Sequence, residues 1–265
     1  MMTALAVGTA PAARAQAPAD PLSRAHDLYN QRQYDAAIRA AAEAERQPAT
    51  AAAAAVVSSR AHLERYRQSS EPADLDAARE ALTPLASATL SPRDRLDWSI
   101  AMGELLYFDR RFSTAAEFFE IGLGRSDELE PGARESLTEW WAEALDQQAQ
   151  LGPESERQPL YQRILSRAEA ELRKDDRSLV ASYWLAAAAV GVGDLDRAWA
   201  AAEAAWLRAQ GGGPAHDKLR EDLDRLVATV IIPERVRHLS PTGDPRPAMA
   251  LMQQSWEEMK QRYGK

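Results

Sequence analysis

The sequence contains no cysteine, so disulfides, thiolate catalysis, cysteine-ligated zinc and lipid attachment through an N-terminal cysteine are all excluded. Aromatic residues are only 7% of the chain. Outside the N-terminal stretch, no segment is apolar for the ~20 residues that a membrane-spanning helix requires. We therefore expect no membrane span.

Clusters of one charge sign are also missing. The net charge is −8, and acidic and basic residues are interspersed along the chain without a basic block. Nucleic acids and anionic membrane surfaces select clustered lysine and arginine, so neither is an expected partner. Overall acidity favours solubility and says little about function.

The residue patterns of common catalytic sites are absent as well. The four histidines, His26, His62, His216 and His238, do not lie at the spacing of metal ligands. No phosphate-binding glycine loop and no GxSxG nucleophile motif occurs. Acidic pairs such as Glu128/Glu130 and Asp222/Asp224 are two residues apart and diverge on a helix, which indicates solvated faces. We expect no cofactor, no metal and no enzymatic activity; an enzyme would need buried acids clustered by the fold.

Alanine is abundant, whereas β-branched residues are sparse and apolar and polar residues do not alternate for long. Alanine has the highest helix propensity and lets helices approach closely. The composition therefore predicts an all-α protein with almost no strand.

A short spacing recurs along the chain. An aromatic residue or leucine followed three residues later by alanine opens four predicted helices, at Tyr34–Ala37, Leu75–Ala78, Phe112–Ala115 and Leu195–Ala198. The alanines are 41, 37 and 83 residues apart, and 83 is about two periods. A period of roughly 34–47 residues is typical of stacked helix pairs. Such arrays are usually binding surfaces.

Apolar periodicity and proline or glycine breaks predict the individual helices. The expected segments are two helices within 21–46, then 51–67, 75–85, 92–108, 112–124, 131–150, 159–174, 182–190, 195–210, 216–231 and 248–263. In the last one, Met252, Trp256, Met259 and Tyr263 form a stripe that we expect to pack on the rest of the array.

The N-terminal residues 1–17 are typical of an export signal. Apolar residues precede a run of small residues that allows cleavage after Ala15 or Ala17, although no positively charged region stands before them. We expect a periplasmic or secreted protein. The other interpretation is an alanine- and proline-rich tail on a cytoplasmic protein.

The pattern of the helix pairs resembles the tetratricopeptide repeat (TPR), over roughly residues 21–210. Met102, Gly103 and Leu106 match its first-helix positions, and Phe112, Ala115, Phe119 and Gly122 match its second-helix positions. The pairs at 21–46 and 182–210 match similarly, whereas the second and fourth pairs match only in outline. Trp98 lies one residue early, and the closing prolines are displaced.

The resemblance implies a right-handed α-solenoid of about five antiparallel helix pairs. The predicted organisation is a signal at 1–17, a repeat array at 18–210 and a helical extension at 211–265 that caps the array. Small residues are expected where the paired helices cross, with Phe112 and Phe119 filling the space between successive pairs.

First helices line the inner surface of such an array. The residues predicted to bind a partner there are Tyr29, Glu104, Tyr107, Phe108, Trp141 and Tyr183. Tyr107 and Phe108 have a second interpretation, in which they only close the turn between two helices. Trp140 and Trp141 are adjacent and diverge by about 100°, so both cannot lie equally deep in one layer. One is expected in the core, and the other either faces a partner or, as the pattern favours, is also at least partly buried.

The sequence thus favours a non-enzymatic interaction scaffold of the bacterial cell envelope that binds a protein or peptide on its concave surface. The alternative is a helical-repeat protein that binds a small ligand for a transport system. The oligomeric state is left open.

Overall fold

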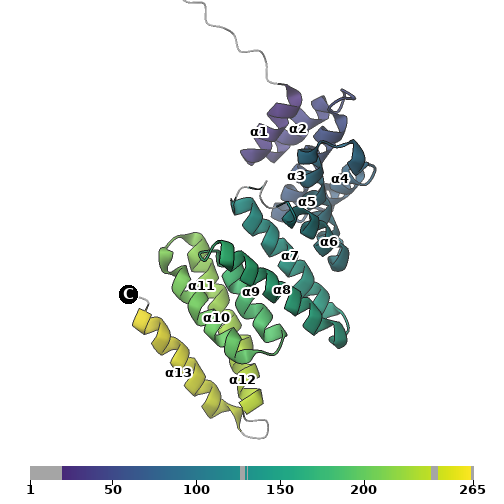
Figure 1. The fold of residues 1–265 in the computed structure, drawn as a ribbon. Coiled ribbons are helices and arrows are strands. Elements are labelled where there is room, and N and C mark those ends of the chain that lie inside the picture. The colour runs from purple at the N-terminus through teal and green to yellow at the C-terminus, as the bar shows by residue number, and fades with distance from the viewer. Residues whose placement is uncertain (1–19, 126–128, 130, 240–243, 264–265) are drawn as a thin grey trace, which may run out of the picture. The chain divides into compact units, whose positions relative to one another are not determined.

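The computed structural model describes residues 20–125, 129, 131–239 and 244–263, and these residues form helices and turns without a strand. The predicted signal at 1–17 lies outside the described residues. The contacts divide the chain into two compact units, Met1–Arg95 and Leu96–Lys265, at a position that the sequence does not mark. Within the described residues, no helix is both long and apolar enough to cross a membrane. The all-α class is confirmed (Figure 1).

The first unit contains four α-helices, each packed on the next. They are α1 (Pro21–Asn30), α2 (Tyr34–Ala44), α3 (Ala51–Ser69) and α4 (Pro72–Leu82), followed by a 3-10 turn, η1 (Ser87–Thr89). Asp20 caps α1 by accepting a hydrogen bond from the Ser23 backbone N–H. Much of the core consists of buried alanines, which allow the helices to lie close together.

In the second unit, too, helices pack on their neighbours in the chain. Its α-helices are α5 (Pro92–Phe108), whose first four residues belong to the first unit, α6 (Phe112–Leu123), α7 (Pro131–Leu151), α8 (Glu154–Lys174), α9 (Leu179–Gly191), α10 (Leu195–Arg208), α11 (Pro214–Leu226), α12 (Ile232–Leu239) and α13 (Pro245–Tyr263). A 3-10 turn η3 (Ala209–Gly211) and a π-helical segment η4 (Val227–Ile231) connect the later helices. From α6 to α11 each helix contacts the next, α7 also contacts α9, and α9 also contacts α11.

The predicted start of α8 at Pro159 is wrong. The helix begins at Glu154, directly after Pro153, and Pro159 lies inside it. Glu154 and Glu156 place negative charge in the first turn, where the free backbone N–H groups carry partial positive charge. The helix therefore tolerates one missing hydrogen bond at the proline.

Four further helices begin earlier than predicted. They start at Pro72 in place of Leu75, at Leu179 in place of Ser182, at Pro214 in place of His216, and at Pro245 in place of Ala248. Three of them start at a proline, which suits the first helical position. The helix that starts at Leu179 follows Ser178, whose side chain accepts from the Ala181 backbone N–H. The helix expected to end at Ile231 continues to Leu239 through the π-helical segment.

Three turns between helices share one backbone geometry. They are Gln31–Gln33, Asp109–Arg111 and Val192–Asp194, and the middle residue has a positive φ in each: 59° at Arg32, 60° at Arg110 and 82° at Gly193. The three N–H groups of each turn donate to carbonyls at the same offsets in the preceding helix. These turns belong to the first, third and fifth predicted pairs, which are the pairs whose sequences match the repeat best.

The close helix crossings expected from small residues are present in the second unit. A Cβ atom on Gly103 would lie 2.5 Å from the Phe119 ring, and one on Gly122 would lie 2.8 Å from the Leu137 side chain. Phe119 itself is fully buried. Any larger residue would therefore collide with the Phe119 ring where α5 meets α6, and it would displace the Leu137 side chain where α6 meets α7.

The stripe on the last helix packs as predicted. Trp256 is buried, its indole N–H donates to Asp224 at 2.7 Å, and its ring lies 5.8 Å from that of Trp199. Met252 and Met259 pack against the same core, whereas Tyr263 at the end of the stripe is 49% exposed. Helix α13 thus belongs to the second unit.

Gly103→Ala is expected to destabilise the protein by about 1–2 kcal/mol, because the overpacking against Phe119 exceeds the helix-propensity gain of alanine. Urea unfolding followed by circular dichroism measures this change. Gly132→Ala on α7 is the matched control, since a Cβ there meets no atom within 4 Å, and it should be neutral or slightly stabilising. Equal midpoints for both variants would contradict the close crossing.

The shared turn geometry predicts opposite effects for two exchanges. Gly193→Ala should destabilise by about 1 kcal/mol, because a Cβ is unfavourable at positive φ. Arg110→Gly should stabilise by about 0.5 kcal/mol, since the relief of that conformation exceeds the entropy loss of glycine. Thermal unfolding of the two variants tests the pair, and a stabilising Gly193→Ala would show that the turn geometry is wrong.

Candidate functional site

A groove with a volume of about 460 Å³ lies between α7, α9 and α11 of the second unit. Helix α7 contributes Glu135, Glu139, Glu143, Asp146 and Gln147, α9 contributes Leu179, Val180, Tyr183 and Trp184, and α11 contributes Ala215, Lys218, Leu219 and Asp222. We call this the α7–α9–α11 groove. Its volume lies within the range of typical ligand sites, about 300–1,000 Å³.

The acidic wall follows from helical spacing on α7. Glu135, Glu139 and Glu143 are four residues apart, and Asp146 follows three residues later, so all four share one helix face. Leu179, Val180, Tyr183 and Trp184 occupy the facing side of α9 by the same rule. The groove is therefore acidic along one wall and apolar to aromatic along the other.

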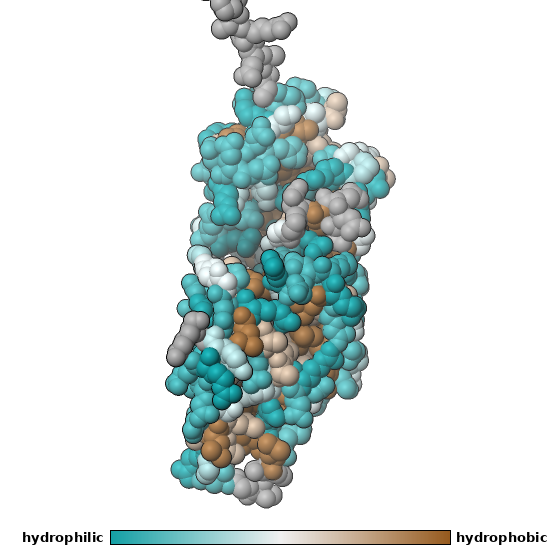
Figure 2. Space-filling view, turned by 60° about the vertical axis from the view of Figure 1, so that its left-hand side comes forward, coloured by the Kyte–Doolittle hydropathy of each residue, from teal (hydrophilic) through white to brown (hydrophobic). Residues whose placement is uncertain are grey.

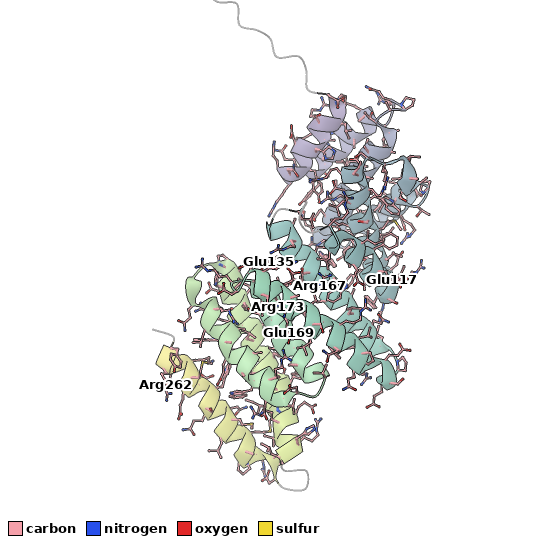
Figure 3. All side chains as sticks on the ribbon, viewed as in Figure 1. Glu117, Glu135, Arg167, Glu169, Arg173 and Arg262 are labelled. Atoms are coloured by element: carbon pink, nitrogen blue, oxygen red, sulfur yellow. The ribbon has the colours of Figure 1, made fainter. Side chains whose placement is uncertain are left out.

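Glu135 joins the two walls at one end of the groove. Its Oε1 accepts from the Ser178 hydroxyl at 2.7 Å and from the Leu179 backbone N–H at 3.1 Å. Both donors lie at the start of α9, so Glu135 caps one helix from another (Figure 3). This contact fixes the distance between the walls.

Two further acids are held by tyrosines. Glu143 accepts from the Tyr107 hydroxyl at 2.8 Å, and Asp146 accepts from the Tyr161 hydroxyl at 2.7 Å. Burial raises the pKa of Asp146, against the lowering effect of its hydrogen bonds from Tyr161 and Gln150, and the neighbouring charge of Glu143 raises it further. Burial and the bonded carboxylate likewise raise the pKa of Tyr107 and of Tyr161.

Several charged residues of the groove act on Tyr183. Burial raises the pKa of its phenol, and the charges of Asp222, Asp146 and Glu143 raise it further. Its ring packs edge-on against Trp184, with the centroids 5.4 Å apart. Among the described residues its hydroxyl has no hydrogen-bond partner.

Positive charge at the groove is sparse. Lys218 on α11 is the only lysine or arginine among the residues that line it, against five carboxylates. Arg225 reaches Asp222 from one turn along α11, at 3.2 Å. The groove therefore has a negative potential, which its low-dielectric walls strengthen.

Three of the predicted site residues meet at this groove. Tyr183 lines it, Tyr107 holds one of its acids, and Phe108 packs edge-on against Tyr107 with the ring centroids 5.9 Å apart. Tyr107 also contacts the ring of Phe112 across the turn, at 5.2 Å. Tyr107 thus closes the helix turn and supports the groove at the same time.

Of the two adjacent tryptophans, the one predicted to contact a partner, Trp141, is the one that the structure buries. Trp141 is 2% exposed, and the Arg167 guanidinium lies over its ring at 5.6 Å. Trp140 is half-buried, 4.9 Å from the Tyr107 ring. One member is in the core as expected, but it is Trp141, so a partner cannot reach this predicted contact without separating the helices.

Two predicted residues lie away from the groove. Tyr29 belongs to the first unit, where the Arg60 guanidinium lies 4.6 Å from its ring centroid and the Tyr34 ring lies 5.8 Å away. Glu104 is half-buried on α5 and is not among the lining residues.

The sequence analysis did not identify the five carboxylates. Their signal was the four-residue spacing of glutamates on α7, which is also typical of a solvated helix face. The pair Asp222/Asp224 does diverge as expected, since Asp222 lines the groove and Asp224 binds Trp256 and Lys260. Sequence spacing alone could not show that α7, α9 and α11 face one another.

Other surface features of the described residues support a binding site less well than the groove does. A pocket of about 490 Å³ in the first unit contains Arg32, Arg39 and Arg65, but Arg65 already pairs with Asp35 at 3.1 Å. Figure 2 shows a mostly hydrophilic face with apolar patches in its middle and at its lower end. Leu239 and Leu251, each 68% exposed, are among the exposed apolar residues, and nothing in the structure shows what covers them.

Comparisons with known proteins identify no relative. No family model matches the chain, and no curated protein or solved structure has significant similarity to it.

Asp146→Asn is expected to raise the stability of the free protein at pH 7. A carboxyl with a raised pKa stabilises the fold when protonated, and that contribution is present below the ordinary aspartate pKa of about 3.9 and lost as pH rises through the folded value. Asparagine keeps an acceptor for Tyr161 without the buried charge. Unfolding midpoints measured from pH 7 to pH 4 should converge as pH falls, and a midpoint below wild type at pH 7 would contradict the expectation.

Proposed function

We propose that this chain is a TPR-like helical repeat protein that binds a protein or peptide segment in the α7–α9–α11 groove and has no enzymatic activity. In this proposal the helix pairs are α1/α2, α3/α4, α5/α6, α7/α8 and α9/α10, arranged as a right-handed solenoid. Helices α11–α13 form the cap, and α7 and α9 are first helices that face the inner surface.

The observation that carries the proposal is the composition of the groove walls. Three helices that are not consecutive in the chain contribute mostly half-buried acids, an apolar wall and the half-buried ring of Tyr183. Aromatic side chains at the centre of a groove with a polar rim are typical of protein-binding sites. The repeated turns and the contacts of α7 with α9 and of α9 with α11 support the repeat arrangement.

The chemistry of the acids supports binding over catalysis. Glu135, Glu143 and Asp146 each accept hydrogen bonds from the protein itself, which holds them in fixed positions. No group of three or more acids, histidines or cysteines within the described ranges is arranged to hold a metal ion. We therefore favour a non-enzymatic scaffold of the cell envelope, periplasmic or secreted, with a cytoplasmic location as the alternative.

A small ligand is the second candidate, as part of a transport system. The groove volume and the free hydroxyl of Tyr183 favour it, since small-molecule sites combine apolar walls with a few orienting polar groups. The two candidates share one site and differ in what occupies it.

Site-specific photo-crosslinking tests the proposal. Ala215 lies exposed at the edge of the groove, so p-benzoylphenylalanine at this position should crosslink a bound partner in the native envelope. Gln162, exposed on α8, is the matched control position. We expect one recurrent protein at position 215 and none at position 162.

The negative results are also informative. Equal crosslinking at both positions would show contact without groove binding and would overturn the proposal. No crosslink, together with a small molecule found by native mass spectrometry of the purified protein, would replace it with the small-ligand candidate.

A further inference from the structure

We propose that the occupant of the α7–α9–α11 groove is a cationic peptide segment, in which lysine or arginine residues adjoin apolar ones. This inference rests on the proposed function and specifies the chemistry of the partner. It follows from the charge, the wall composition and the contacts of the groove.

Charge complementarity is the first argument. Five carboxylates and one lysine line the groove. Burial is the main cause of the raised pKa of Tyr183, and three of these carboxylates add to it, whereas Arg225 opposes them. Fixed charges on a concave surface attract counter-charged segments over a Debye length of about 8 Å at physiological salt. A neutral or acidic segment would leave Glu143, whose partner within the protein is the uncharged Tyr107 hydroxyl, without a counter-charge on losing its water.

The acids retain capacity for a ligand. Glu143 uses Oε1 to accept from Tyr107, while its other oxygen has no partner within the described residues. A carboxylate offers about four lone-pair positions, so one internal hydrogen bond leaves room for a guanidinium or an ammonium. The internal bonds from Tyr107 and Tyr161 also orient these acids before a ligand arrives, which reduces the ordering cost of binding.

The apolar wall is the second argument. Leu179, Val180 and Leu219 line the groove beside Tyr183. Arginine and lysine have long aliphatic stems that pack on such surfaces while the charged end reaches an acid. A cation over the face of Tyr183 would gain a cation–π attraction in addition.

The protein already contains the arrangement that we infer for the ligand. The Arg167 guanidinium lies 5.6 Å from the ring centroid of Trp141, and its Nη1 is 3.6 Å from the carboxylate of Glu171 (Figure 3). Arg235 combines the Trp199 ring, at 5.3 Å, with the Asp196 carboxylate, at 2.7 Å. An arginine held between an aromatic ring and an acid is therefore stable in this type of helical packing.

Two other occupants fit the groove less well. A divalent metal ion needs several oxygens converging within about 2–2.6 Å, and no such group occurs among the residues that the structure describes. A second copy of this chain carries a net charge of −8 and would be repelled. A separate basic peptide segment needs no converging metal ligands and is attracted by the acidic groove.

The test compares two short labelled peptides by fluorescence anisotropy. One alternates arginine and leucine, and the other replaces each arginine by citrulline, which has the same shape without the charge. We expect the arginine peptide to bind at least about tenfold more tightly, which corresponds to about 1.4 kcal/mol. Raising the salt from about 0.1 M to about 1 M should remove most of this difference, because the Debye length falls from about 10 Å to about 3 Å.

Three charge variants locate the binding. Asp222→Asn should weaken the arginine peptide by about threefold to tenfold, and Lys218→Gln should strengthen it by about twofold to fivefold, as expected for charges at the edge of an interface. Glu117→Gln, exposed on α6 and outside the groove, removes the same charge as Asp222→Asn and should have no effect (Figure 3). Circular dichroism checks that all three variants remain folded.

The outcomes separate this inference from the proposed function. Equal binding of both peptides, with loss on blocking the groove at Ala215, would overturn the cationic preference and leave the peptide groove in place. Binding of neither peptide, with binding of spermine that Asp222→Asn weakens, would overturn both in favour of a small cation. An equal effect of Glu117→Gln and Asp222→Asn would show a general surface charge effect and would also overturn the inference.

Discussion

Close helix crossing is the constraint on which the rest of the structure depends. Where α5 meets α6 the contact requires Gly103, because even one added carbon would collide with Phe119. In the first unit, buried alanines allow the same close approach of the helices. Helices that approach this closely allow α7 to contact α9 although α8 lies between them in the chain, and these two helices then form the two walls of one groove.

The sequence predicts this framework well because its signals are local. Ser91 and Pro92 mark the start of α5, and residues 109–111 mark the turn to α6, so both boundaries are predicted within a residue. Local sequence signals give the wrong helix boundary or burial where other residues nearby determine the structure. Pro159 looks like a helix start, yet the acids before it begin the helix five residues earlier. The partition of Trp140 and Trp141 depends on which face of α7 meets the core, and adjacent residues carry no local sign of that.

The groove was largely hidden from sequence reasoning for a physical reason. Glu143 and Asp222 come from helices far apart in the chain, and each looks like a solvated acid on its own helix. Tyr183 was predicted from its register with the repeat motif, which places it on the inner face of a first helix. The role of the acids becomes visible only in the folded structure. There, burial raises the pKa of Asp146, and the charges of three carboxylates act on the phenol of Tyr183. Carboxylates held in this way oppose folding and favour a positively charged neighbour, which is the usual compromise between stability and binding.

The three matching turns give the array a modular character. Arg32, Arg110 and Gly193 occupy the same left-handed conformation, and the backbone hydrogen bonds around them are the same. A gene fusion that joins the chain before one of these residues to the chain after another would connect two helices with an unchanged exit direction. Segments of several helices could then be deleted or duplicated at these positions, so the number of helices in the chain is an engineerable quantity.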